Sequence, residues 1–250
     1  MFGTRSKEAT FAMVSPANNT PCIVLLEDDA ELREDILLPG LANYGFIVSG
    51  VATAAALYET LAAHAPDIVV LDVGLPDADG FSVAQAVRAL LPRIGIIMLT
   101  GHGATSDQVR GLSQGADAYL VKPAQVELLA ATVHSLARRL SGRAVPVTAK
   151  RWQFDAKDWC LISPMGRTVA LTKTEQRVMS RLASTLGELV THEQLVVAVT
   201  DNAHDYDPHR IESVIHRLRQ KVARQCGEPL PLTSVHGKGY VLDDERRPAG

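Results

Sequence analysis

Four short apolar runs in the first half of the chain each end at a side chain capable of chemistry. These side chains are two neighbouring carboxylates, a lone aspartate, a hydroxyl and an ammonium: Glu27 with Asp28, Asp72, Thr100 and Lys122. Such runs are typical of buried parallel strands. Ligands of an open α/β sheet bind outside the carboxyl ends of its strands. We therefore expect these side chains to meet at one edge of a sheet, where a divalent cation and a phosphoryl group could bind.

The residue types suit this chemistry. Mg²⁺ prefers one or two carboxylates together with water and phosphate oxygens, so Glu27 and Asp28 are candidate ligands and Asp72 a third. Asp72 could also be the nucleophile, because carboxylates form acyl phosphates. The Lys122 ammonium and the metal would neutralise phosphoryl oxygens, and the Thr100 hydroxyl could donate a hydrogen bond to one. Clustered carboxylates repel one another, so we expect the cation to bind before the chemistry.

The first half of the chain alternates between apolar strands and amphipathic helices. We expect strands at 22–27, 46–51, 67–72, 94–100 and 117–121, and helices at 30–43, 53–64, 80–91, 104–114 and 124–140. This alternation predicts an α/β fold with a five-stranded, parallel, doubly wound sheet.

The pattern changes after a short linker, residues 142–149. Strand-like pieces on either side of a turn at 164–167 come first. Helices at 172–186, 191–199 and 209–225 follow, and then a strand pair around 237–239. Capping boxes, Thr172 with Glu175 and Thr191 with Gln194, mark two helix starts. The second half therefore reads as an α+β domain.

Charge and composition indicate two globular domains with different partners. The 250 residues are 46% hydrophobic. Residues 1–142 hold 9 Lys and Arg against 15 Asp and Glu, a balance of −6, and residues 143–250 hold 16 against 13, a balance of +3. Opposite signs suggest that the second domain binds nucleic acid.

Nothing in the sequence indicates a membrane segment. No apolar stretch approaches the ~20 residues of a membrane helix, and residues 1–20 lack the apolar core of a signal peptide. We expect residues 1–20 and 244–250 to be disordered, with Met13 a possible true start. Three widely spaced cysteines, Cys22, Cys160 and Cys226, suit reduced thiols, so we expect a cytoplasmic protein.

Residues 209–225 form the most charged predicted helix, with five Lys or Arg against one Glu. Its apolar residues fall at helical spacing and should face the core: Ile211, Val214, Ile215, Leu218 and Val222. Arginine can pair with guanine in the major groove, and glutamate can accept a hydrogen bond from cytosine. A solvated amphipathic face is the alternative interpretation.

Four ordered segments resemble the signature of response-regulator receiver domains: VLLEDD at 24–29, VLDVGLP at 70–76, MLTG at 98–101 and GADAYLVKP at 115–123. The resemblance assigns residues 21–141 to a receiver domain. It implies that a partner histidine kinase phosphorylates Asp72.

The same resemblance implies a role for each residue of the site. Asp28, Asp72 and the Gly74 carbonyl would hold Mg²⁺ with help from Glu27, while Thr100 and Lys122 would contact the phosphoryl group. Tyr119 would be a switch aromatic that moves with Thr100. The alternative interpretation is that Tyr119 is an ordinary half-buried aromatic residue of a strand.

Residues 150–243 resemble the winged-helix output domain of OmpR/PhoB-type regulators. The resemblance rests on four segments, at 171–175, 189–195, 209–225 and 234–240. The resemblance implies that helix 209–225 enters the major groove, with Arg217 as base reader and Glu212 as a second. The wing, with His236 and Lys238, would approach the adjacent minor groove. Further expected DNA contacts come from Arg210, Ser213, His216, Arg219 and Gln220, with Thr172 and Thr191 near phosphates.

The chain departs from the family pattern at several sites. His236 stands where the family usually has arginine, Ala124 where it has a larger apolar residue, and Gly101 where it has alanine. Members of the family pair as homodimers through two helices, here 104–114 and 124–140, and bind tandem half-sites on double-stranded DNA.

The salt bridges of that dimer are largely missing from this sequence. Two basic–acidic pairs are replaced by Gln108 with Leu128 and by Ala118 with Thr132, and Asp117 remains, with Arg138 or Arg139 as possible partners. Both partners of a pair are missing together, which avoids unpaired charge at an interface. We therefore expect a more apolar dimer.

The function expected from these features is a two-component transcriptional regulator switched by phosphorylation of Asp72. One alternative is an atypical regulator that dimerises and binds DNA without phosphorylation. Another is a metal-dependent phosphatase, which would need a second carboxylate just after the nucleophile, where Val73 and Gly74 stand. The acidic loop 204–207 could contact RNA polymerase or be merely solvated.

Overall fold

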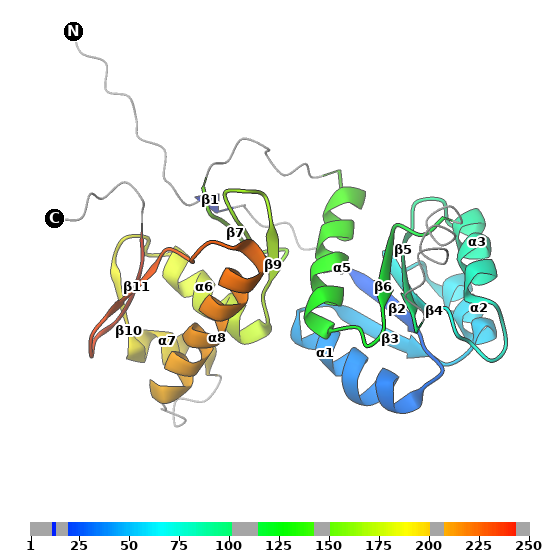
Figure 1. Ribbon diagram of the computed structural model, residues 1–250, viewed down its shortest axis with the longest axis horizontal. Coiled ribbons are helices and arrows are strands. Elements are labelled where there is room, and N and C mark those ends of the chain that lie inside the picture. The colour runs from blue at the N-terminus through cyan, green and yellow to red at the C-terminus, as the bar shows by residue number, and fades with distance from the viewer. Residues whose placement is uncertain (1–11, 14–19, 102–114, 143–150, 201–207, 244–250) are drawn as a thin grey trace, which may run out of the picture. The chain divides into compact units, whose positions relative to one another are not determined.

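The computed structural model describes residues 12–13, 20–101, 115–142, 151–200 and 208–243. These residues form two compact units (Figure 1): residues 20–142, and residues 151–243 together with Ala12 and Met13. The expected helix 104–114 and the acidic loop 204–207 lie outside the described residues. Within the described ranges, no helix has the length and apolar character needed to span a membrane.

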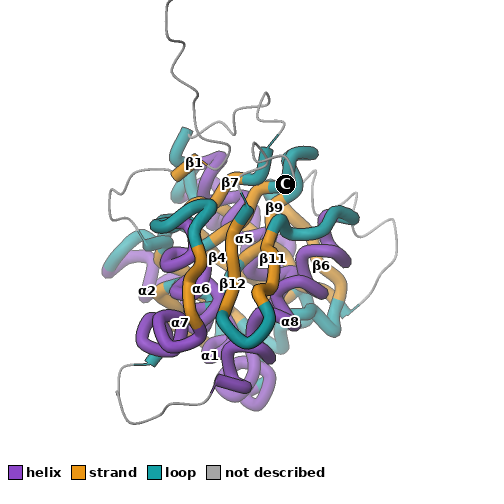
Figure 2. Tube along the Cα trace, turned by 90° about the vertical axis from the view of Figure 1, so that its left-hand side faces the viewer, coloured by secondary structure: helices purple, strands orange, loops and turns teal. Residues whose placement is uncertain are grey.

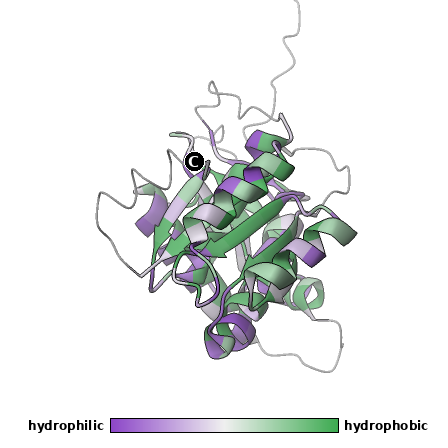
Figure 3. Ribbon diagram, turned by 90° about the vertical axis from the view of Figure 1, so that its right-hand side faces the viewer, coloured by the Kyte–Doolittle hydropathy of each residue, from purple (hydrophilic) through white to green (hydrophobic). Residues whose placement is uncertain are grey.

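The first unit is built on the predicted five-stranded parallel sheet. Its strands are β2 (Cys22–Leu26), β3 (Ile47–Val51), β4 (Ile68–Asp72), β5 (Gly95–Thr100) and β6 (Ala118–Val121), in the order β3-β2-β4-β5-β6. All neighbouring pairs are parallel. Every residue of β4 and β5 is buried, because helices cover both faces of the sheet; Figure 3 shows these hydrophobic strands between helices of mixed character. The prediction of a doubly wound fold is confirmed.

The helices of this unit are η1 (Leu32–Leu37), α1 (Leu38–Asn43), α2 (Ala54–Ala63), α3 (Gly80–Leu90) and α5 (Val126–Leu140). The first expected helix, 30–43, contains the wider π-helical turns of η1, whose last turn is closed by the Leu38 N–H bonded to the Arg33 carbonyl. Pro39 accounts for this widening, because its ring cannot donate a hydrogen bond and would clash with the carbonyl four residues earlier in an α-helix.

In its described residues the second unit has two sheets and three helices, which Figure 2 shows by secondary structure. One sheet contains β7 (Gln153–Asp155), β8 (Cys160–Ile162) and β9 (Thr168–Ala170); the other has β10 (Leu189–Thr191), β12 (Gly239–Leu242) and β11 (Leu232–Val235), in that order. The helices are α6 (Lys173–Ala183), α7 (His192–Val199) and α8 (Pro208–Cys226). Both predicted capping boxes are present, at Thr172 and Thr191.

A further strand, β1 (Ala12–Met13), pairs in parallel with β7 and extends its sheet. This pairing differs from the expectation that residues 1–20 form only a disordered extension. The three cysteines are free thiols, as predicted.

His134 on α5 is buried in the first unit, with its ring centroid 4.4 Å from that of Phe46. Burial lowers the pKa of His134 from 6.5 to about 3, and the charge of Arg138 acts in the same direction, against a backbone hydrogen bond at Tyr44. Below pH 6.5 the unfolded chain therefore takes up a proton that the folded unit does not. The stability contributed by neutral His134 is present above pH 6.5 and is lost as the pH falls towards 3.

We predict that His134→Leu flattens the pH dependence of stability in the first unit between pH 6.5 and 4. The histidine contributes at most roughly 1.4 kcal/mol per pH unit in this window. Urea unfolding, followed by hydrogen exchange in peptides from β4 and β5, measures the slope. The exposed His64 provides the control variant His64→Gln, which should keep the parent slope. Equal slopes for all three proteins would contradict the prediction.

Candidate functional site

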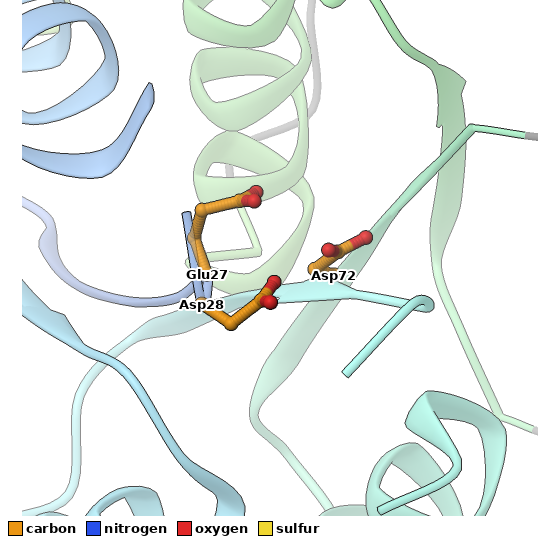
Figure 4. A group of neighbouring side chains, drawn as sticks. All are labelled: Glu27, Asp28 and Asp72. Atoms are coloured by element: carbon orange, nitrogen blue, oxygen red, sulfur yellow. The ribbon is translucent and has the colours of Figure 1, made fainter. Parts of the chain in front are cut away.

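Three carboxylates meet at the carboxyl edge of the parallel sheet, as Figure 4 shows. Glu27, Asp28 and Asp72 each offer an oxygen, and these oxygens lie within 4.8 Å of one another. Glu27 and Asp72 are only 1% and 4% exposed, whereas Asp28 faces solvent. The predicted acidic cluster is therefore present, with one side open to water.

The Lys122 ammonium lies between the two buried carboxylates. Its Nζ is 2.8 Å from both Oε1 and Oε2 of Glu27 and 2.9 Å from Oδ2 of Asp72. Strand pairing fixes this position, since β6 lies beside β5 and the Lys122 N–H donates to the Thr100 carbonyl at 2.6 Å. One cation thus contacts two buried anions and offsets part of their negative charge.

Burial and neighbouring charges together shift the pKa values of Glu27 and Lys122. Burial raises the pKa of Glu27, and the charges of Asp72 and Asp28 add to this effect, while Lys122 opposes it. Burial alone would lower the pKa of Lys122, but its hydrogen bonds to Glu27 and Asp72 outweigh burial and raise it. Lys122 therefore stays charged at neutral pH.

Thr100 lies on β5, the strand next to β4, and Tyr119 lies on β6, the edge strand beyond β5. Thr100 ends β5 and is 2% exposed. Tyr119 is half-buried against the core between the sheet and α3, and its buried hydroxyl has no hydrogen-bond partner within the described part of the chain. The structure thus places both residues as expected, and the switch role of Tyr119 stays a prediction.

Two glycines shape the backbone around Asp72. The Gly74 N–H donates to Asp72 Oδ1 at 3.2 Å. A Cβ on Gly80 would lie 2.5 Å from the Asp72 carbonyl oxygen and 2.7 Å from the Val73 Cα. Only glycine therefore lets the start of α3 approach the end of β4 this closely. Sequence reasoning missed Gly80, because its need appears only when the helix and strand are packed together.

Arg33 is a second residue that sequence reasoning missed. Its Nη1 donates to the Glu27 carbonyl at 2.6 Å and to the Asp28 carbonyl at 3.3 Å. A Cβ on Gly50 would meet the Arg33 side chain at 3.0 Å, so the arginine stem packs on β3. A cation in the first turns of a helix opposes the helix dipole, which is the one signal that could have marked it.

We predict that Arg33→Met weakens divalent-cation binding at the acidic cluster by roughly two- to tenfold, the equivalent of one lost hydrogen bond. Methionine keeps an apolar stem on Gly50 but releases the two carbonyls that hold the acidic loop. Titration calorimetry with Mg²⁺ measures the affinity. Arg33 also pairs with the exposed Glu34 at 2.9 Å, so Glu34→Gln is the control and should bind like the parent. Unchanged affinity in Arg33→Met would rule out this role.

A cavity of about 410 Å³ lies beside Lys122. Apart from Lys122 its lining is apolar: Leu32, Ile36, Leu37, Leu99, Pro123 and Ala124. The small side chain of Ala124 thus faces open space next to the acidic cluster.

Helix α8 presents the charged surface of the second unit. Its apolar residues are buried, as predicted: Ile211, Val214, Ile215, Leu218 and Val222. Six of the expected contact residues are exposed: Arg210, Glu212, Ser213, His216, Arg217 and Gln220. The turn between β11 and β12 exposes His236 and Lys238 and contains Gly237 at a φ of 66°. A hollow of about 350 Å³ separates α8 from this turn.

Two basic residues of α8 are held inside the unit. Arg219 donates to Ser234 Oγ at 3.1 Å and to the Leu232 carbonyl, and its guanidinium lies 5.7 Å from the centre of the Tyr240 ring. Lys221 is buried and bonds Glu175 at 2.5 Å and the Ala170 carbonyl at 2.9 Å. Arg219 therefore braces α8 against β11 and β12, and Lys221 joins α8 to α6.

The residues expected at the dimer face include one that already has partners in the first unit. Asp117 pairs with Arg88 of α3 at 2.6 Å and accepts the Ile96 N–H at 2.8 Å, both within its own unit. Its pairing with Arg138 or Arg139 across a dimer stays a prediction. The exposed apolar residues of β6 and α5 include Val121 and Leu128, at 42% and 52%.

Comparison with known proteins agrees with this geometry. Residues 23–134 match the response regulator receiver domain, and residues 166–242 match the C-terminal domain of transcriptional regulatory proteins.

Three similar proteins span nearly the whole chain. The transcriptional regulatory protein AfsQ1 of Streptomyces coelicolor is 32% identical over 89% of this chain and 98% of its own length. TctD of Salmonella typhimurium is 33% identical over 88% of this chain and 96% of its own length. PhoP of Escherichia coli K12 is 31% identical over 88% of this chain and 98% of its own length. These relatives are transcriptional regulators. The chain belongs to the OmpR/PhoB-type response regulators of two-component systems, which control transcription through a receiver domain and a DNA-binding domain.

Proposed function

We propose that a histidine kinase phosphorylates Asp72 and that this modification controls binding of the second domain to DNA. The observation that carries the proposal is the position of Asp72. Its carboxylate is buried at the end of β4 and lies 2.9 Å from Lys122 Nζ, within the acidic cluster. A nucleophile, a cation for phosphoryl oxygens and carboxylate ligands for a metal thus share one sheet edge.

Mg²⁺ fits the donor set of this cluster. The donors are carboxylate oxygens, and the exposed Asp28 leaves one side open to the water and phosphate oxygens that Mg²⁺ prefers to keep. We assign the ion to Asp28, Asp72 and the Gly74 carbonyl, with Glu27 assisting. When bound, Mg²⁺ supplies positive charge that neutralises phosphoryl oxygens.

In this proposal Asp72 accepts the phosphoryl group directly. A carboxylate oxygen of Asp72 forms the new O–P bond while the N–P bond to the kinase histidine breaks, and the imidazole leaves with the bonding electron pair. Lys122 contacts one phosphoryl oxygen through its ammonium, and Thr100 donates a hydrogen bond to another.

The added phosphoryl group could switch the receiver. Moving a two-state equilibrium from ~1% to ~99% active requires about 5.5 kcal/mol of differential stabilisation. Charge-assisted hydrogen bonds from Lys122 and Thr100, each worth ~1.5–3 kcal/mol, supply a free energy of this size. Tyr119 would follow Thr100, because its hydroxyl makes no hydrogen bond in the described chain that would hold it in place.

We assign dimerisation to a face that includes β6 and α5, together with the expected helix 104–114, which lies outside the described residues. Within the described part of this face, Val121 and Leu128 are exposed apolar residues, and Asp117 is already paired inside its own domain. This supports a homodimer held more by apolar contacts than by salt bridges. Such a dimer would place two copies of α8 on tandem half-sites.

The same observations favour a second candidate, a regulator that dimerises and binds DNA without phosphorylation. An apolar face can pair with the same face of a second protein copy without a phosphoryl group on Asp72. The complete acidic cluster with Lys122, however, favours a regulator that is controlled by phosphorylation.

Intact masses of the protein and of Asp72→Ala, taken after incubation with Mg²⁺ and a small phosphodonor, test the proposal. We expect one phosphoryl mass on the parent and none on the variant, because Asp72 is the only proposed acceptor. Omitting Mg²⁺ should strongly slow the reaction. A folded parent without an adduct would reject phosphorylation at Asp72 and leave the second candidate.

For DNA recognition we predict different effects of two arginines on α8. Exposed Arg217 is the proposed base reader, so Arg217→Ala should cost about 1–3 kcal/mol at one base pair and relax specificity there. Arg219 is engaged with Leu232, Ser234 and Tyr240, so Arg219→Ala should weaken binding to all sequences alike.

Binding titrations on a selected site and its single-base variants separate the two effects. Arg224→Ala, an exposed arginine near the end of α8, is the control and should change affinity little. Loss of base discrimination in Arg219→Ala instead of Arg217→Ala would contradict the assignment.

A further inference from the structure

The N-terminal segment is part of the DNA-binding unit, although the receiver domain separates it from that unit in sequence. Ala12 pairs with Gln153 and Met13 with Phe154, in parallel, so β1 becomes the outermost strand of the sheet β1-β7-β8-β9. Figures 1 and 2 both show β1 beside β7. This contact was not foreseen from the sequence.

Strand β7 has one edge on β8, and β1 lies on the other. The pairing with β8 runs along the full length of β7, from Gln153 to Asp155. All three β7 residues are buried, and Phe154 is 0% exposed within the core of the unit. A strand at the edge of a sheet otherwise presents unpaired N–H and C=O groups to other chains.

The sequence of the N-terminal segment suits strand addition. Residues 11–14 (FAMV) form a short apolar run between the polar stretches SKEAT and SPANNT. A run of this kind can add to an open sheet edge through main-chain hydrogen bonds alone. The apolar run and the observed pairing are independent observations that coincide at Ala12 and Met13.

We propose that the outer edge of β7 is a strand-addition site and that its occupant is the segment around Ala12 and Met13 of the same chain. Two paired residues form a weak interaction, but covalent connection gives the segment a high effective concentration. Occupation closes the edge to other molecules. It also makes the receiver domain an insertion between two paired strands, joined to the DNA-binding unit by residues 14–19 and by residues 143–150.

Amide hydrogen exchange in the full chain tests this site. The double variant Ala12→Pro/Met13→Pro removes both N–H groups of β1 and should therefore abolish its pairing with β7. The β7 amides that face away from β8 then lose their β1 carbonyl acceptors and should exchange roughly two- to tenfold faster, as expected for one lost hydrogen bond. Amides of β8 and β9 should be unchanged, which shows that the unit stays folded. Ala9→Pro, three residues before β1 in the sequence, is the matched control and should exchange like the parent.

A second variant and a dilution series complete the test. Deletion of residues 1–17 should reproduce the double-proline result without introducing proline. Unchanged β7 exchange in both variants would overturn the proposal. Protection in the parent should be the same at every protein concentration; protection that is lost on dilution would show that a second copy supplies the strand and would overturn occupation by the same chain.

Discussion

The receiver site depends on the charge balance around one ammonium group. Lys122 Nζ lies within 2.9 Å of both Glu27 and Asp72, which are almost fully buried, while Asp28 adds a third negative charge at the surface. Two buried carboxylates without a counter-charge would be costly, so Lys122 stabilises the fold in addition to its role in the proposed chemistry. A phosphoryl group on Asp72 adds further negative charge that one lysine does not balance. The metal proposed for this cluster follows from that deficit.

Much of this arrangement could be predicted from sequence. Apolar runs identify parallel strands, and the topology of such sheets brings their carboxyl ends to one edge. Glu27, Asp28, Asp72, Thr100 and Lys122 could therefore be assigned to one site without coordinates. The apolar face of α8 was equally predictable, because helical spacing fixes which residues turn inward.

The remainder depends on contacts between residues distant in sequence. Helical spacing could not show that Arg219 turns to Ser234 and Tyr240, or that Lys221 reaches Glu175. The Asp117–Arg88 pair joins the residue before β6 to α3, and no local sequence pattern predicts it. The same holds for the close approach at Gly80 and for β1, whose partner strand lies beyond the whole receiver domain.

The stability of a Lys122→Met variant, with and without Mg²⁺, tests the charge-balance account most directly. Urea unfolding read on receiver peptides by hydrogen exchange gives the free energy of unfolding for the variant and the parent. Without Mg²⁺ at neutral pH, the variant should lose about 1–3 kcal/mol, because Glu27 and Asp72 lose their counter-charge. Saturating Mg²⁺ should stabilise the variant more than the parent. Equal stability of the two proteins without Mg²⁺ would contradict the account.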